Sequence, residues 1–214
     1  MDKPIFITGA PRSGKGIIAG ILDICGVFSG EVDSLWENQR INQTLLNPYL
    51  TYHGCDGQGW GKLPVSSKLS IPGNWKEKVD NCIMSDGYER GLWMLKSTKI
   101  ALTWPVWEYH YPRSKHIIVR RRTGDIVSSC LQTGYMSDYY NRDGWVNLVR
   151  EYEKRFVEMI SEGLNCKVIW PHRMAYGDYE QVYELLEWLG LGWKTEILTH
   201  IDPKFWKTRK NRKS

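Results

Sequence analysis

The residues best suited to chemistry lie in a short glycine-containing loop near the start of the chain. Residues 9–16 read Gly-Ala-Pro-Arg-Ser-Gly-Lys-Gly, and they follow the apolar run 4–8 and open a helical pattern. In such a loop successive backbone N–H groups point inward, and the start of the helix adds about half a positive charge. Arg12 and Lys15 bring two mobile cations to the same place. The sequence therefore predicts a phosphate-binding loop.

The residue after Lys15 bears on which nucleotide this loop binds. Loops that bind ATP or GTP with magnesium place Ser or Thr there to ligate the metal, whereas this chain has Gly16. The later apolar runs end in lysine, arginine and proline rather than in an acid that could hold the metal. A magnesium-dependent NTPase is therefore disfavoured, and no metal site is predicted. A nucleotide or nucleoside kinase stays open as an alternative because of the Gly-Lys pair in the loop.

A second candidate anion site follows the apolar run 116–120. Arginines end this run, and two serines fall in the first turns of the next predicted helix. An arginine fork and a hydroxyl that converge on one point form a good phosphate clamp. Arginines at strand ends also pair with acids such as Asp125, so this pattern alone is not specific for an anion site. It becomes specific in combination with the loop at residues 9–16. Together the two segments indicate a ligand with two separate anionic groups.

These two segments resemble the PAPS-dependent sulfotransferase family, in particular its bacterial and viral-like members. The 5′-phosphosulfate loop of that family reads Pro, Arg or Lys, Ser, Gly, Thr, then Ser or Thr, and residues 11–14 match it. Its 3′-phosphate motif spaces Arg, Asp and Ser four residues apart after a strand, as do Arg121, Asp125 and Ser129. Weaker similarities extend the likeness across most of the chain.

The resemblance implies a sulfotransferase that moves a sulfuryl group from PAPS to a hydroxyl or amine and releases PAP, without a metal. Arg121 and Ser129 would hold the 3′-phosphate. The other donor-binding residues would be Pro11, Arg12, Ser13, Gly14, Lys15 and Gly16. The chain departs from the family at Lys15-Gly16, which replaces two hydroxyl residues, and at Thr98, where cytosolic relatives carry the histidine of a Lys-x-His sequence. A non-catalytic nucleotide-binding descendant is therefore a further alternative.

The remaining catalytic groups follow from the chemistry of sulfuryl transfer. Charge builds on the oxygens around sulfur in the transition state, so cations at those oxygens matter most. We assign Arg12 and Lys15 to the 5′-phosphosulfate and the transition state, and we add Lys96 to the same cluster. An acceptor hydroxyl also needs a base within hydrogen-bond reach. The candidates, in order, are Glu31 and Asp33 in the polar loop after the first helix, then His53 and His110.

The hydrophobic pattern around these motifs alternates between strands and helices. Apolar runs typical of buried parallel strands occur at residues 4–8, 92–95, 116–120 and 167–170. Helical patterns occur at residues 17–25, 125–131, 147–160 and 179–189. This alternation predicts βαβ units and, with the phosphate loop, a three-layer α/β P-loop fold with a central parallel sheet flanked by helices.

We expect residues 1–203 to form one sulfotransferase-like domain, followed by a basic tail at 204–214. Because the tail holds six Lys and Arg residues, the rest of the chain is close to neutral in spite of a net charge of +5. Residues 47–91 are rich in glycine and proline, so we expect a loop-rich insertion that binds the acceptor. The acceptor would be a small molecule or carbohydrate, and the tryptophans able to stack on its ring are Trp36, Trp60 and Trp75.

Composition indicates a soluble, cytoplasmic protein. Charged residues make up 25% of the chain and hydrophobic residues 42%, which is typical of a globular domain. No run approaches the ~20 apolar residues that span a bilayer, and no signal peptide precedes the first strand. Five widely spaced cysteines indicate neither a disulfide framework nor a zinc site. We therefore expect no membrane partner, and the near-neutral body predicts no nucleic-acid partner.

Overall fold

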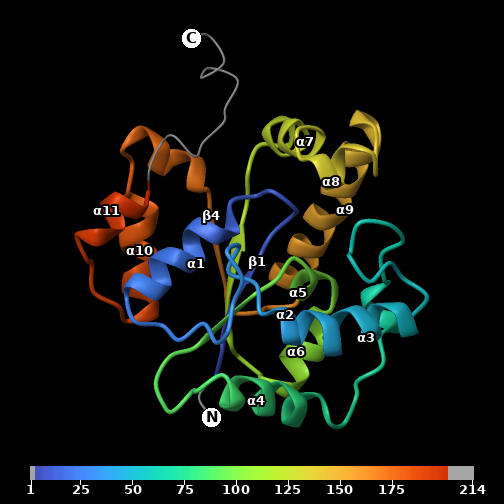
Figure 1. Cartoon of the computed structure of the whole chain (residues 1–214), viewed down its shortest axis with the longest axis horizontal. Coiled ribbons are helices and arrows are strands. Elements are labelled where there is room, and N and C mark those ends of the chain that lie inside the picture. Colours follow the sequence, from blue (N-terminus) through green and yellow to red (C-terminus); the bar gives the residue numbers. More distant parts are fainter. Residues whose placement is uncertain (1–2, 202–214) are drawn as a thin grey trace.

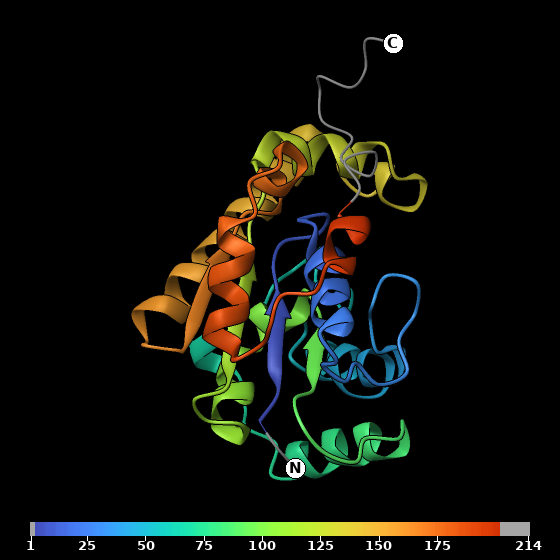
Figure 2. The same ribbon diagram turned by 90° about the vertical axis from the view of Figure 1, so that its left-hand side faces the viewer.

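The computed structural model describes residues 3–201, so the basic tail predicted at 204–214 lies outside the described residues (Figure 1). Four strands form one parallel sheet in the order β2-β1-β3-β4. They are β1 (Ile5–Thr8), β2 (Met94–Lys96), β3 (Lys115–Val119) and β4 (Cys166–Ile169). Figure 2 shows β1 in blue beside β2 in green. All four predicted strands are confirmed, with ends shifted by one or two residues.

The connections between strands change direction between β1 and β3, where open parallel sheets typically form a crevice. β1 lies between its two partners, with Ile7 opposite Lys96 of β2 and Ile117 of β3. The chain leaves β1 toward β2 on one side and leaves β3 toward β4 on the other side. Open parallel sheets bind ligands at the carboxyl ends of strands where the connections diverge in this way. The two segments predicted to bind anions follow β1 and β3, so they flank this crevice.

Alternate side chains of the sheet enter two different cores, because successive residues of a strand point to opposite faces. Ile5 and Ile7 pack against one helical layer, and Phe6 packs against the other. The first layer contains α1 (Lys15–Ile24), α10 (Glu180–Leu189) and α11 (Glu196–His200). The second contains α2 (Gln39–Ile41), α3 (Asn47–Tyr52), α4 (Trp75–Ser85), α5 (Lys99–Leu102), α6 (Trp104–His110), α7 (Thr123–Leu131), α8 (Gly134–Ser137) and α9 (Arg142–Ser161). The two layers lie on opposite sides of β1 in Figure 1, which confirms the predicted three-layer fold.

The predicted helices are all present, and α9 begins earlier than predicted. The side chain of Asn141 accepts the N–H of Gly144 at 2.9 Å, so this N-cap starts the helix at Arg142 rather than at residue 147. The prediction of loops at residues 47–91 is wrong for α3 and α4. In α4 the buried side chains of Trp75, Val79 and Ile83 recur every four residues, and their burial in the core stabilises the helix between its glycine-rich flanks.

Covalent and membrane features of the described chain are simple. All five cysteines are free thiols, of which Cys130 is buried. No helix within residues 3–201 combines the length and apolar character needed to cross a membrane. The packed cores on the two faces of the sheet therefore hold the loops in place without disulfide bonds.

Candidate functional site

A cavity of about 870 Å³ opens at the carboxyl ends of β1 and β2. This volume lies in the upper part of the range of about 300–1,000 Å³ that is typical of small-molecule sites. Its lining includes six of the eight residues of the predicted phosphate loop: Pro11, Arg12, Ser13, Gly14, Lys15 and Gly16. Asp33, Lys96 and Arg121 also line it. The fold thus gathers most of the predicted site residues around one cavity.

The phosphate loop has a tightly constrained backbone. A Cβ atom on Gly9 would lie 2.4 Å from the carbonyl oxygen of Val119 and 2.6 Å from Ser13 Oγ, so only glycine fits there. Gly14 caps α1 with a φ of 95°, and Arg12 has a φ of 60°. The left-handed conformation costs a residue such as Arg12 about 1–2 kcal/mol, and strain of this kind gathers at functional sites. The buried Ser13 hydroxyl has no hydrogen-bond partner within residues 3–201, so it remains able to bind a ligand oxygen.

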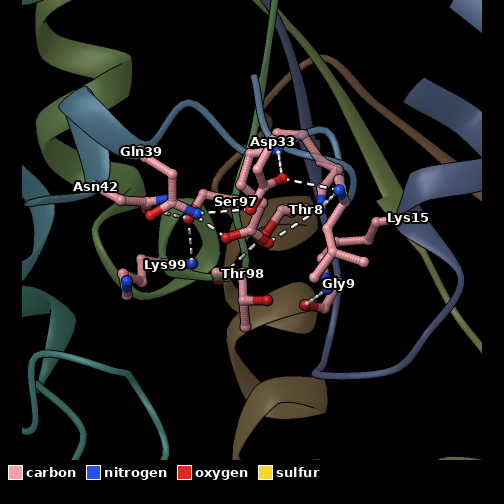
Figure 3. A network of polar contacts seen from close by, with 12 residues as sticks. Thr8, Gly9, Lys15, Asp33, Gln39, Asn42, Ser97, Thr98 and Lys99 are labelled. Carbon is pink, nitrogen blue, oxygen red and sulfur yellow. Dashed lines mark hydrogen bonds and ion pairs between the residues drawn. The ribbon is translucent and has the colours of Figure 1, made fainter. Parts of the chain in front are cut away.

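Lys15 lies in the concave side of this loop. Its Nζ donates to the carbonyl oxygens of Gly9 at 3.2 Å and Ala10 at 2.8 Å (Figure 3). Burial lowers the pKa of Lys15 from 10.5 to about 7, and the positive charges of Lys96 and Arg12 act in the same direction. An anion bound in the loop would reverse this shift by stabilising the charged amine.

The two predicted anion motifs are in direct contact. Arg12 Nε donates to Ser129 Oγ at 3.0 Å, and Arg121 Nη1 donates to the carbonyl oxygen of Arg12 at 3.1 Å. The first bond joins the loop after β1 to α7, and the second joins that loop to the end of β3. Two positive side chains from segments 109 residues apart in the chain thus lie close together at the carboxyl ends of β1 and β3.

A lysine and a carboxylate face the cavity together beyond the phosphate loop. Lys96 Nζ donates to the carbonyl oxygen of Leu35 at 2.6 Å and to Glu37 Oε1 at 3.0 Å. The second carboxylate oxygen of Glu37 accepts from Asn42 Nδ2 at 3.2 Å. Sequence reasoning missed Glu37, although it lies in the same polar loop as the two acids that were selected. The three acids are too close in sequence to be ranked without the path of the loop.

Asp33 lines the cavity, but its carboxylate is engaged by its own loop. Oδ1 accepts the N–H groups of Leu35 at 2.8 Å and Glu37 at 2.9 Å, and Oδ2 accepts from Gln39 Nε2 at 2.7 Å (Figure 3). Burial opposes the charged form, yet these hydrogen bonds outweigh it and hold the pKa of Asp33 below its usual value. A carboxylate with this lowered pKa is a weak proton acceptor and shapes the loop instead.

The other predicted bases do not line the cavity. Glu31 Oε2 lies 3.1 Å from Arg40 Nη2 on the exposed outer side of its loop. His53 Nε2 lies 3.1 Å from Ser70 Oγ, and His110 Nε2 lies 2.8 Å from a backbone carbonyl oxygen. Within the described part of the chain, no group of three or more His, Cys, Asp or Glu side chains is placed to hold a metal ion.

Aromatic side chains form part of the cavity wall. Trp36 and Trp60 line the cavity, whereas Trp75, the first residue of α4, is buried in the core. The ring of Trp60 stacks on Tyr135 with centroids 6.1 Å apart and an interplanar angle of 22°. Of the three tryptophans selected from the sequence, two are thus placed to contact a ligand.

Comparisons with known proteins identify related folds. No protein-family model matches the sequence, and no curated protein matches it significantly. The structure is similar to the sulfotransferase domain from the curacin biosynthetic pathway, with a TM-score of 0.61, 16% identity, and coverage of 97% of this chain and 87% of that one. For the sulfotransferase domain of the Synechococcus PCC 7002 olefin synthase the TM-score is 0.60 and the identity 13%, with coverage of 97% of this chain and 86% of that one. For sulfotransferase STF9 from Mycobacterium avium the TM-score is 0.60 and the identity 12%, with coverage of 94% of this chain and 67% of that one. At these identities the likeness shows that this chain shares the sulfotransferase fold.

Proposed function

We propose that this protein is a sulfotransferase that uses PAPS as donor and transfers its sulfuryl group to a hydroxyl or amine of a small molecule or carbohydrate. The contact between the two anion-binding motifs carries this proposal. Arg12 belongs to the loop after β1, and its side chain and carbonyl group bond to Ser129 and Arg121 of the other motif. A nucleotide with phosphates at both its 5′ and 3′ positions needs two such sites within the length of one ligand.

The loop residues fit the 5′ end of such a donor. The unpartnered Ser13 hydroxyl, the close turn at Gly9 and the start of α1 are features that bind an anionic oxygen. Arg12 and Lys15 would hold the 5′-phosphosulfate, and Arg121 and Ser129 would hold the 3′-phosphate. PAPS supplies a sulfuryl group whose transfer leaves PAP.

Glu37 is the side chain best placed to accept the proton of the acceptor. It lines the cavity, and one of its oxygens is oriented by Lys96 Nζ at 3.0 Å. Lys15 and Lys96 place two cations beside the loop, where they would stabilise negative charge that develops on the sulfuryl oxygens and the leaving oxygen. Glu37 thus replaces Glu31 and Asp33 as the proposed base, because Glu31 lies outside the cavity lining and the hydrogen bonds of its own loop hold the pKa of Asp33 below its usual value.

The decisive experiment compares PAP with ADP plus magnesium as ligands in thermal unfolding. A ligand at 100 times its Kd stabilises the native state by ~2.7 kcal/mol, which raises Tm measurably. PAP is expected to raise Tm and ADP with magnesium to leave it unchanged, and radiolabelled PAPS is expected to label members of an acceptor library. Stabilisation by ADP with magnesium alone would favour the kinase alternative. Binding of PAP without any transfer would favour the non-catalytic alternative.

A further inference from the structure

The cavity has a second positively charged end that the donor motifs do not explain. Lys99, at the start of α5, lines it together with Gln58 and Trp60 from the loop at residues 56–61. In Figure 3 Lys99 lies on the opposite side of the polar network from Lys15. The donor cations are therefore at one end of the cavity and Lys99 is at the other.

The ammonium group of Lys99 is buried and has a neutral partner. The residue is 6% exposed, and its Nζ donates to Asn47 Oδ1 at 2.5 Å. Burial lowers the pKa of Lys99, while the more distant carboxylates of Glu37 and Asp56 favour its charge. By contrast, the equally buried Lys96 forms an ion pair with Glu37. Lys99 thus differs from Lys96 in having no contacting carboxylate within the described residues.

The loop beside Lys99 engages the carboxylate of Asp56. Asp56 accepts the N–H groups of Gln58 at 3.0 Å, Trp60 at 2.9 Å and Gly61 at 2.8 Å, so its carboxylate is used in forming the turn. A Cβ built on Gly59 would lie 3.6 Å from Lys99 Cγ, which shows that this turn packs against the lysine stem. The stem is held in place while the charged end contacts no carboxylate among residues 3–201, and a buried charge in this state favours an incoming anion.

We propose that the acceptor carries an anionic group, a carboxylate or a sulfate, which binds Lys99 while its nucleophile faces Glu37. This inference rests on the proposed sulfotransferase function and specifies its substrate class. Glu37 lines the same cavity as Lys15 and Lys99, and its negative charge favours the charged form of both lysines. The stacked rings of Trp60 and Tyr135 add an apolar wall, and Trp60 lies beside this end. The acceptor is therefore an acid with a planar or sugar ring.

The test uses acceptors in matched pairs that differ in a single anionic group. One pair is 4-methylphenol and 4-hydroxyphenylacetate, and the other is N-acetylglucosamine with and without a 6-sulfate. Transfer from PAPS is measured as kcat/KM, and acceptor binding to the protein saturated with PAP is measured by calorimetry. We expect the wild-type protein to prefer the charged member of at least one pair by tenfold or more, and the pair that responds distinguishes a carboxylate from a sulfate.

Variants of Lys99 show whether this residue causes the preference. Lys99→Met and Lys99→Gln should each abolish the preference and leave PAP binding unchanged. Lys62→Met removes a positive charge from an exposed residue that does not line the cavity, so it should keep the preference. Circular dichroism and Tm would reveal whether either variant misfolds. Because two different replacements are made at residue 99, misfolding of one still leaves the other to test the proposal.

The outcomes separate this inference from the proposed function. If PAP binds but the charged member of neither pair is preferred in turnover or in binding, the anionic acceptor is overturned while the donor assignment stands. The same conclusion follows if the preference survives in both Lys99 variants, because the lysine then only links α5 to Asn47 of α3. If PAP itself does not bind, the sulfotransferase proposal fails, and the acceptor inference fails with it.

Discussion

The charge state of Lys15 makes donor binding dependent on pH in a way that one substitution should remove. Its amine has a pKa of about 7 in the free protein because it is buried near other cations. A bound polyanion favours the charged amine, so PAP binding should take up a proton above pH 7. The nearby Cys130 thiol has its pKa raised to about 11 by burial, so it stays protonated and neutral over this range.

The size of the effect follows from the protonated fraction of Lys15. With a pKa of about 7, that fraction is about one half at pH 7 and about one hundredth at pH 9, so the affinity for PAP should fall about 50-fold between them. The terminal phosphate groups of PAP have lost their second proton by pH 7, since that pKa is about 6, and contribute little to this change. At pH 8 about 0.9 of a proton should be taken up for each PAP bound.

Calorimetry in two buffers of different ionisation enthalpy measures both the Kd and the proton uptake. Lys15→Arg is the matched variant, because a guanidinium stays charged throughout this range. It should bind PAP with little dependence on pH between 7 and 9. A flat profile in the wild-type protein, or an equally steep one in Lys15→Arg, would refute the assignment of Lys15 to the anion site.

The free protein should show the effect of the same group on stability. The pKa of Lys15 is lower in the folded state than its unfolded value of 10.5, so between pH 7 and 10.5 the unfolded chain binds more protons. The free energy of unfolding should therefore rise with pH through this window. Urea unfolding of the wild-type protein, with Lys15→Arg as the reference, measures the difference.

Three further substitutions test the loop, the clamp and the base. Gly9→Ala should cost about 1–3 kcal/mol of stability in thermal unfolding, because the new Cβ would lie 2.4 Å from the Val119 carbonyl oxygen. Gly124→Ala is the control: its Cβ would enter open space, so it should lower Tm little or not at all. Equal losses of stability in the two variants would contradict the steric argument. Ser129→Ala should weaken the binding of PAP about tenfold in calorimetry and change the affinity for AMP, which lacks the 3′-phosphate, by less than twofold. An equal loss of affinity for both ligands would show that Ser129 does not bind the 3′-phosphate. Glu37→Gln should lower kcat by about 10²–10⁴ and leave PAP affinity unchanged, and an unaltered kcat would remove Glu37 as the base.

Features carried by neighbouring residues could be predicted from the sequence. The runs that became β1 to β4 are mostly apolar, and a strand buried on both faces, such as β1, needs only such a run. The loop at residues 9–16 lies between a strand and a helix, so its geometry is set by its two immediate neighbours. The order of residues was therefore enough to predict the fold class and the position of this loop between β1 and α1.

Features that depend on packing at a distance could not be predicted. The glycines and prolines of residues 47–91 indicated loops, but α4 forms there because Trp75, Val79 and Ile83 meet a core built from remote strands and helices. Local composition favours flexibility, whereas burial of these side chains stabilises the helix by more than the local preference opposes it. No pattern within the segment reveals that the core is present.

The choice among the acids of the polar loop was also decided by tertiary structure. Sequence alone determined that cations would gather after β1 and β3, because parallel strands bring their carboxyl ends to one edge of the sheet. Only the folded chain determined that Glu37 meets Lys96, that Glu31 turns toward Arg40, and that Lys99 lines the cavity with the amide of Asn47 as its partner. Strand ends are aligned by the ladder of backbone hydrogen bonds, but the direction of a loop side chain depends on every element that packs against it.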